Sequence, residues 1–242
     1  MTADRSKLRF SAVVLAAGQS SRMGGANALL LELAGEPLVR RTVRTVLAAG
    51  VQETVVVTGW QGREITRAVL DLPVTVQANL RWEDGQMRSV AAGVAALAQA
   101  TDAIFVCPGD LPLLRPGDLH ELMDAWLAHP DSSIVIPRFG GERGNPIVFA
   151  AAYAPEVAAG RRLIGCRKLA EQYPQETFWH DAAHERFTTV CDTPQAYQQA
   201  GQDQGDADGG PGGAAHFRPP PVAPGPAAPA PAGTPAACRK RW

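Results

Sequence analysis

The segment that decides the fold reads Val13-Val14-Leu15-Ala16-Ala17-Gly18-Gln19-Ser20-Ser21-Arg22-Met23-Gly24-Gly25. An apolar run ends at a glycine, and small polar residues, an arginine and two more glycines follow. The apolar run is typical of a strand that a parallel sheet buries on both faces. Small residues let the backbone of the next loop approach phosphate oxygens closely, and Arg22 adds a planar positive group. We therefore predict a strand followed by an anion-binding loop, at the sheet edge where open α/β folds bind ligands.

Two other phosphate-binding motifs do not fit this loop. A P-loop requires a lysine and a hydroxyl residue after its last glycine, whereas Ala26 and Asn27 follow Gly25. The dinucleotide motif GxGxxG requires a glycine where this chain has Ser20. The alternative interpretation of the segment is an ordinary connection between a strand and a helix, without a ligand.

The first 200 residues alternate strand-like and helix-like segments. Such alternation predicts an α/β fold with a doubly wound, mostly parallel, Rossmann-like sheet and right-handed crossovers. Gly93 is expected to weaken one of the helices slightly. Strands are predicted over residues 11–17, 53–58, 74–78, 103–107, 133–137, 147–149 and 187–190, and helices over 37–49, 61–70, 87–98, 116–128 and 167–172.

Composition divides the chain near residue 200. Residues 1–200 are expected to form one domain, because their content of apolar residues suffices for a core. From Gly201 onward, proline, alanine and glycine dominate and large apolar residues are scarce. Residues 201–242 are therefore predicted to be a disordered tail.

Charge and cysteine usage narrow the classes of partner. The chain of 242 residues has a formal net charge of −1, which does not favour nucleic acid as a partner. It contains no apolar stretch near the ~20 residues that cross a bilayer, and no signal-peptide pattern at its start, so we expect no membrane partner. The 4 cysteines lack metal-site spacing, which fits a reducing cytoplasm.

A second motif carries a candidate metal ligand. The apolar segment 103–107 runs into Pro108-Gly109-Asp110-Leu111-Pro112. A carboxylate at the carboxyl end of a strand suits Mg²⁺, which takes one or two protein carboxylates together with phosphate oxygens and water. The alternative is that Asp110 merely belongs to a turn.

Further candidates follow along the chain. Asn79 supplies both a donor and an acceptor, which suits the edge of a base, and Gly85 and Ser89 follow it. Asp192 is a further candidate carboxylate ligand. The alternative is that Asp192-Thr193-Pro194 merely begins a helix. Arg143 and Arg167 are suitable partners for a substrate phosphate, although surface arginines are common.

These motifs, taken in order, resemble those of nucleotidyltransferases, and most of all the molybdenum cofactor cytidylyltransferases of the MobA-like NTP transferase family. The resemblance covers residues 11–200. It rests on Leu15-Ala16-Ala17-Gly18 with Arg22-Met23-Gly24, on Gly109-Asp110-Leu111-Pro112, and on Arg143-Gly144-Asn145-Pro146, with weaker matches at Gly165-Cys166-Arg167 and Asp192-Thr193-Pro194. Many relatives have a further aspartate where this chain has Val190.

The resemblance assigns a role to each candidate. It implies a catalytic role for Arg22 and Asp110, and Mg²⁺ held by Asp110 and Asp192. It implies substrate contacts by Arg143, Asn145 and Arg167. The nucleotide would contact Leu15, Ala16, Ala17, Gly18, Arg22, Gly24, Asn79, Gly85 and Ser89.

The implied reaction transfers CMP from CTP to the phosphate of molybdopterin, with release of pyrophosphate. The alternatives are a guanylyltransferase that uses GTP, a sugar-phosphate nucleotidyltransferase, and a non-catalytic carrier that delivers the cofactor to a molybdenum hydroxylase apoenzyme. The Ala-Ala-Gly sequence of the first loop favours cytidylyl transfer over guanylyl transfer.

One position departs from the family pattern. Relatives carry a lysine where this chain has Ala28. A cation held against a transferring phosphate acts electrostatically, and loss of one such group typically slows a reaction by about 10²–10³. The sequence therefore predicts a nucleotide site with impaired turnover, which is also what favours the carrier alternative.

Overall fold

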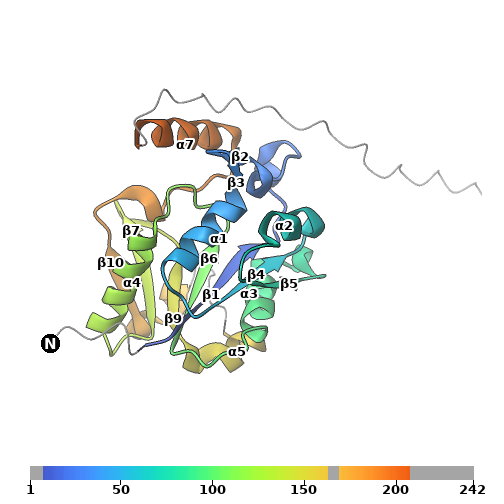
Figure 1. Ribbon diagram of the computed structural model, residues 1–242. Helices are drawn as coiled ribbons and strands as arrows, with labels where there is room; N and C mark the ends of the chain where they lie inside the picture. Colours follow the sequence, from blue (N-terminus) through green and yellow to red (C-terminus); the bar gives the residue numbers. More distant parts are fainter. Residues whose placement is uncertain (1–7, 163–168, 208–242) are drawn as a thin grey trace, which may run out of the picture.

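The structure is a computed structural model that describes residues 8–162 and 169–207 (Figure 1). Its centre is an eight-stranded sheet in the order β10-β7-β9-β6-β1-β4-β5, with β8 paired to β7. The strands are β1 (Phe10–Ala16), β4 (Glu53–Thr58), β5 (Thr75–Ala78), β6 (Ala103–Pro108), β7 (Ile134–Phe139), β8 (Glu142–Arg143), β9 (Ile147–Ala150) and β10 (Thr177–Asp181). A separate two-stranded sheet pairs β2 (Glu32–Leu33) with β3 (Glu36–Pro37).

The strand directions confirm the predicted fold class. β1 runs parallel to both β4 and β6, β4 runs parallel to β5, and β10 runs parallel to β7. Only β9 and the short β8 pair in the antiparallel sense within this sheet, as far as residues 8–162 and 169–207 show. The result is the mostly parallel, Rossmann-like α/β sheet that the alternation of segments predicts.

Helices cover both faces of the sheet, which explains why β1 is buried along its whole length and why apolar residues dominate the central strands. One face packs against α1 (Leu38–Ala48), α2 (Gly62–Val69) and α4 (Pro116–Ala128), and the other against α3 (Gln86–Ala95) and α5 (Ala154–Ala158). In β1, Val14 points to the first of these layers and Val13 to the second. No helix of the described ranges has the length and apolar character needed to cross a bilayer.

The prediction of a last strand over residues 187–190 is wrong. Residues 187–190 are not a strand, because Glu185–Phe187 form a 3-10 helix and the amides of Thr188 and Thr189 donate to the carbonyl of Glu185. The side chain of Phe187 is buried in the core, which accounts for an apolar residue at this position without a strand. The actual edge strand is β10, whose half-buried Thr-Phe-Trp-His-Asp sequence lacks an apolar run.

Two helices lie near the limits of the described residues. Of the predicted helix 167–172, α6 (Leu169–Gln172) is helical, while residues 167 and 168 lie outside the described ranges. α7 (Pro194–Ala207) lies beside β2 and β3 in Figure 1 and crosses the domain boundary predicted between residues 200 and 201. Tyr197 and Ala200 pack it against Leu33 and Leu38. The remainder of the predicted tail, residues 208–242, lies outside the described residues.

Gly93 provides a test of how tightly α3 packs on the sheet. A Cβ atom at this position would lie 2.3 Å from Cγ1 of Val13 and 2.7 Å from Cγ2 of Val57. We expect Gly93→Ala to lower the free energy of unfolding by about 1–3 kcal/mol, because the added methyl group would overpack the core between α3 and the sheet. Urea denaturation measures the change.

The matched control is Gly117→Ala in α4, where a Cβ atom would meet nothing within 4 Å. That substitution should leave stability unchanged or raise it by up to about 1 kcal/mol. Equal effects of the two substitutions would show that the space between α3 and β1 does not limit residue 93.

Candidate functional site

The parallel register brings three strand ends to one place. Leu15 of β1 pairs with Pro108 of β6, and Ala16 pairs with Thr58 of β4. The loops after these strands are joined by backbone hydrogen bonds, from the amide of Gly109 to the carbonyl of Leu15 and from that of Trp60 to the carbonyl of Ala17. The loop after β1 therefore lies beside the loop that carries Asp110, as open parallel sheets position their ligand sites.

The loop after β1 is compact and open to solvent. Residues 21–23 form a 3-10 turn that ends at Gly24 in the left-handed conformation, with φ of 63°. Gly18, Arg22 and Gly24 are exposed, whereas Met23 is buried and anchors the loop. The hydroxyl of Ser20 accepts a hydrogen bond from the amide of Ala28, at 3.2 Å. Glycines at the left-handed positions allow this tight turn without a clash of side chains.

A cavity of about 550 Å³ opens over these loops. It is about the size of a pocket for a small organic ligand. Among the predicted residues that line it are Gly18, Arg22, Ser89, Asp110 and Asp192. Its remaining lining is Leu15, Ala17, Gln19, Ser20, Ser21, Leu29, Trp82, Glu83, Gly85, Gln86 and Pro108.

Asp110 and Asp192 converge on the cavity although 82 residues separate them in the sequence. The amide of Cys191 donates to the carbonyl of Asp110 at 2.9 Å, which holds the segment around residue 192 against the end of β6. Arg22 forms an ion pair with Asp192, with 2.7 Å between Nη2 and Oδ2. The predicted grouping of an arginine and two carboxylates is therefore present in one cavity.

The carboxylate of Asp110 is the most perturbed acid of this cavity. Burial raises its pKa from the ordinary 3.8 to about 6, the nearby charge of Asp192 adds to the rise, and its own backbone hydrogen bond and Arg22 oppose it. Among the described residues, no group donates a hydrogen bond to its buried Oδ1. Buried oxygen atoms without partners, together with a second carboxylate, are the donor set that Mg²⁺ binds. The residues present therefore fit the predicted metal.

Asn79 supports the cavity rather than lining it. Its Nδ2 donates to Oγ of Ser89 at 3.0 Å, and its Oδ1 accepts from the amide of Arg81 at 3.0 Å. Asn79 thereby fixes the orientation of Ser89, which does line the cavity with Gly85 at the start of α3. Ala16, on β1, and Gly24, at the end of the loop, also lie outside the lining.

Ala28 lies next to the loop and is not among the residues that line the cavity. Its side chain is buried with Met23 and Ala26, while its neighbour Leu29 lines the cavity. Asn27 caps this turn, because its side chain accepts from the amide of Leu29 at 3.1 Å. A small apolar cluster therefore occupies the place where the family pattern has a cation.

The three predicted substrate contacts have different outcomes. Arg143 belongs to β8, and the amide of Asn145 donates to the carbonyl of Phe187 at 2.8 Å. Neither lines the cavity of the first loop, so the structure does not bring them together with Asp110. Arg167 lies outside the described residues.

Sequence reasoning missed the aromatic side of the cavity. Trp82 lines it, and Trp82 packs so closely on Gly59 that a Cβ atom there would lie 2.6 Å from the Cβ of Trp82. The same hypothetical atom would lie 2.7 Å from the carbonyl oxygen of Ala17. The sequence did contain a signal for Trp82, because it lies between Asn79 and Gly85, which are both candidates for contact with the nucleotide.

Comparison with known proteins identifies the family of the chain. The sequence matches the MobA-like NTP transferase domain family over residues 12–177. It is 31% identical over 188 residues to the Bifunctional protein GlmU of Zymomonas mobilis subsp. mobilis, which covers 76% of this chain and 38% of the relative. The chain spans about a quarter to two fifths of the length of the curated relatives it matches.

Two solved structures share the fold. A nucleotidyl transferase from Methanothermobacter thermautotroptrophicus superposes with a TM-score of 0.66 at 25% identity, over 79% of this chain and 95% of the other. A CMP:2-keto-3-deoxy-manno-octonic acid synthetase in complex with CTP superposes with a TM-score of 0.62, over 82% of this chain and 99% of the other. At 15% identity, the second likeness concerns the fold alone.

The raised pKa of Asp110 predicts a pH-dependent stability. Its pKa in the folded chain, about 6, exceeds the ordinary 3.8, so the charged form is disfavoured by folding. Without metal, Asp110→Asn should be more stable than the natural chain by about 1–3 kcal/mol at pH 8. The difference should shrink between pH 6 and pH 4, where the natural carboxyl is protonated in the folded state. Urea denaturation in EDTA measures it, and a difference that is constant with pH would contradict burial as the cause.

Proposed function

The chain belongs to the MobA-like NTP transferase domain family, and on this premise we propose that it transfers CMP from CTP to the phosphate of a molybdopterin-type cofactor. The observation that carries the proposal is the cavity where the loop after β1, Asp110 and Asp192 meet. An anion-binding loop beside two carboxylates suits a triphosphate with its metal. The ordered motifs of the molybdenum cofactor branch support the choice of acceptor.

The proposed reaction needs no general base. An oxygen of the acceptor phosphate, already ionised at neutral pH, forms a bond to the α-phosphorus of CTP. The bond from that phosphorus to the bridging oxygen breaks, and pyrophosphate leaves. Catalysis of such a step is mainly positioning and charge stabilisation. The chain would supply both through its loop and its charged side chains.

Each charged residue of the cavity has a proposed task. Asp110 and Asp192 would hold Mg²⁺, which neutralises charge on the phosphate oxygens when bound. The side chain of Arg22 is 70% exposed and pairs with Asp192 through Nη2 at its tip, so it would be able to turn from Asp192 toward a phosphate. Arg22 and Asp110 are the residues to which we assign catalytic roles.

Other residues would select the two substrates. Ser89, held by Asn79, and Gly85 lie at the start of α3, where they would contact the base. Trp82 lines the same side and offers an aromatic face for stacking. Arg143, Asn145 and Arg167 would contact the phosphate and ring of the pterin.

Specific observations favour two other functions. The match to the wider NTP transferase domain family makes a sugar-phosphate acceptor the second candidate, and GTP in place of CTP is a variant of the first. Ala28, buried in an apolar cluster, favours a carrier that binds the cofactor and hands it to a molybdenum hydroxylase apoenzyme without turnover.

The nucleotide is tested by calorimetric titration of the chain with CTP, GTP and ATP in the presence of Mg²⁺. We expect CTP to bind more tightly than the other two, and Asp110→Ala to weaken that binding at least about 10-fold because the metal loses a ligand. The control is Asp71→Ala, which removes an exposed carboxylate that pairs with Arg40 on α1. Tighter binding of GTP would reassign the nucleotide, and absence of binding by all three would contradict the proposal.

Turnover is tested with Ala28→Lys. We expect this variant to form the cytidylylated cofactor about 10²-fold faster than the natural chain, because a cation returns beside the triphosphate. The control is Ala26→Lys, since Ala26 belongs to the same buried cluster and a lysine there disturbs the packing equally. Tight binding of CTP and cofactor, without product in either Ala28→Lys or the natural chain, would favour the carrier.

A further inference from the structure

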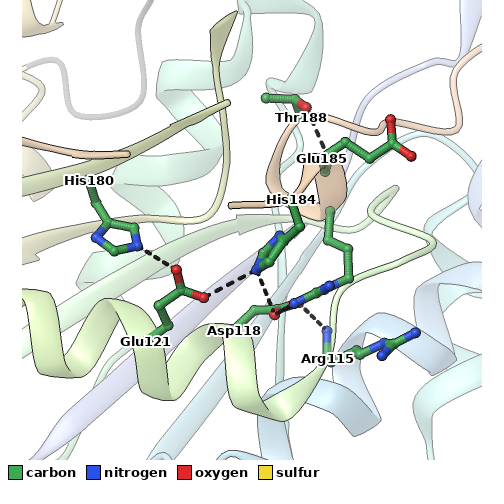
Figure 2. Close-up of polar contacts among 8 residues, drawn as sticks. Arg115, Asp118, Glu121, His180, His184, Glu185 and Thr188 are labelled. Atoms are coloured by element: carbon green, nitrogen blue, oxygen red, sulfur yellow. Dashed lines mark hydrogen bonds and ion pairs between the residues drawn. The ribbon is translucent and has the colours of Figure 1, made fainter. Parts of the chain in front are cut away.

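A second group of metal-ligating side chains lies apart from the nucleotide cavity, and its interpretation does not depend on the proposed function. Figure 2 shows His180 and His184 directed toward the carboxylate of Glu121, with Asp118 beside His184. Nε2 of His180 lies 2.6 Å from Oε1 of Glu121. Nε2 of His184 lies 3.2 Å from Oε2 of Glu121 and 3.4 Å from Oδ1 of Asp118.

Three elements bring the four side chains together. Asp118 and Glu121 are three residues apart on α4, so they project from the same side of the helix. His180 belongs to β10, and His184 follows it at the start of the 3-10 turn Glu185–Phe187. All four side chains are at least two-thirds buried, and that of Asp118 is only 2% exposed. The four side chains are therefore held by the residues that surround them, unlike charged side chains on an exposed surface.

The spacing of the ligand atoms suits a tetrahedral ion. Bonds of about 2.0–2.1 Å to nitrogen and oxygen place neighbouring ligand atoms about 3.3 Å apart around Zn²⁺. The separations of 3.2 and 3.4 Å from His184 match that edge length. One oxygen or nitrogen from each of Asp118, Glu121 and His184 lies within 4.8 Å of the others. His180 is not one of that group of three, and its Nε2 lies at hydrogen-bond distance from Glu121, 2.6 Å from Oε1.

We propose that Asp118, Glu121, His180 and His184 form a binding site for a divalent transition-metal ion of the Zn²⁺ class. Two imidazoles and two carboxylates suit Zn²⁺ and its neighbours, whereas Mg²⁺ prefers oxygen ligands only. The site thus differs in chemistry from the all-oxygen pair of Asp110 and Asp192.

Neighbouring residues orient the ligands. Arg186 donates to both oxygens of Asp118, with Nη2 at 2.6 Å from Oδ1, and the amide of Arg115 donates to Oδ2 at 2.9 Å. When both imidazoles are neutral, the charges of Asp118, Glu121 and Arg186 sum to −1. Hydrogen bonds of this kind commonly fix carboxylates that bind metals.

The ion would tie α4 to the segment that returns to the nucleotide cavity. After His184, Phe187 packs against Gly144, where a Cβ atom would lie 2.8 Å from that of Phe187. The chain then continues to Cys191, whose amide is bonded to the carbonyl of Asp110. Bound metal should therefore stabilise the folded chain and raise its melting temperature.

The proposal is tested by calorimetric titration of the full chain with Zn²⁺. A second titration uses Co²⁺, because tetrahedral Co²⁺ has an intense visible absorption band. The titrated protein is the Cys166→Ser, Cys238→Ser double variant, because thiolates in general are strong Zn²⁺ ligands and these two cysteines lie outside the described residues. We expect one ion per chain. His184→Asn and Glu121→Gln should each weaken binding by about 10–100-fold or more and abolish the Co²⁺ band.

Two controls separate this site from others. His120→Asn, on the same helix, removes an imidazole whose Nε2 bonds to the carbonyl of Ala49 and should leave Zn²⁺ binding unchanged. Asp110→Asn should also leave it unchanged, which separates this site from the nucleotide cavity. Absence of Zn²⁺ binding, or Zn²⁺ binding that survives both His184→Asn and Glu121→Gln, would overturn the proposal.

Discussion

The parallel pairing of β1 with β4 and β6 is the constraint on which the structure depends. Every residue of β1 is buried, so the strand has to lie between two neighbours and two layers of helices. Once the register aligns Leu15 with Pro108, the loop after β1 and the loop with Asp110 leave the sheet side by side. The cavity is a consequence of this alignment, because it places two loops that are about 90 residues apart in the chain next to each other.

The charge of Asp110 is only partly compensated within the cavity. Asp110 is costly to bury when ionised, and the structure compensates only in part through its backbone hydrogen bond and Arg22. In the proposed function, a divalent ion would offset the charge of the two carboxylates, and Arg22 would exchange Asp192 for a phosphate oxygen. Asp110, which lowers the stability of the free chain when it is ionised, would in the proposed function be a ligand of the metal.

The segment from β10 to α7 holds the periphery together. It carries His180 and His184 toward α4, places Phe187 in the core beside Gly144, and brings Asp192 to the cavity. Tyr197 then anchors α7, since its hydroxyl donates to the carbonyl of Glu32 in β2. A single stretch of about 20 residues therefore connects both candidate metal sites to the body of the domain.

The sequence by itself determined the fold class and the core of the site. Apolar runs ending at Gly18 and Gly109 mark buried strands and the loops after them, because local hydrophobicity and glycine content are properties of short segments. Tertiary structure decided the rest. Trp82 enters the cavity only because Gly59 leaves room for it, and β10 lacks the apolar run of a central strand because it lies at the edge of the sheet. The four proposed ligands on α4, β10 and the following turn meet only because β10 pairs with β7, which contacts α4. This pairing brings His180 to Glu121, 59 residues away in the chain, and no local pattern encodes it.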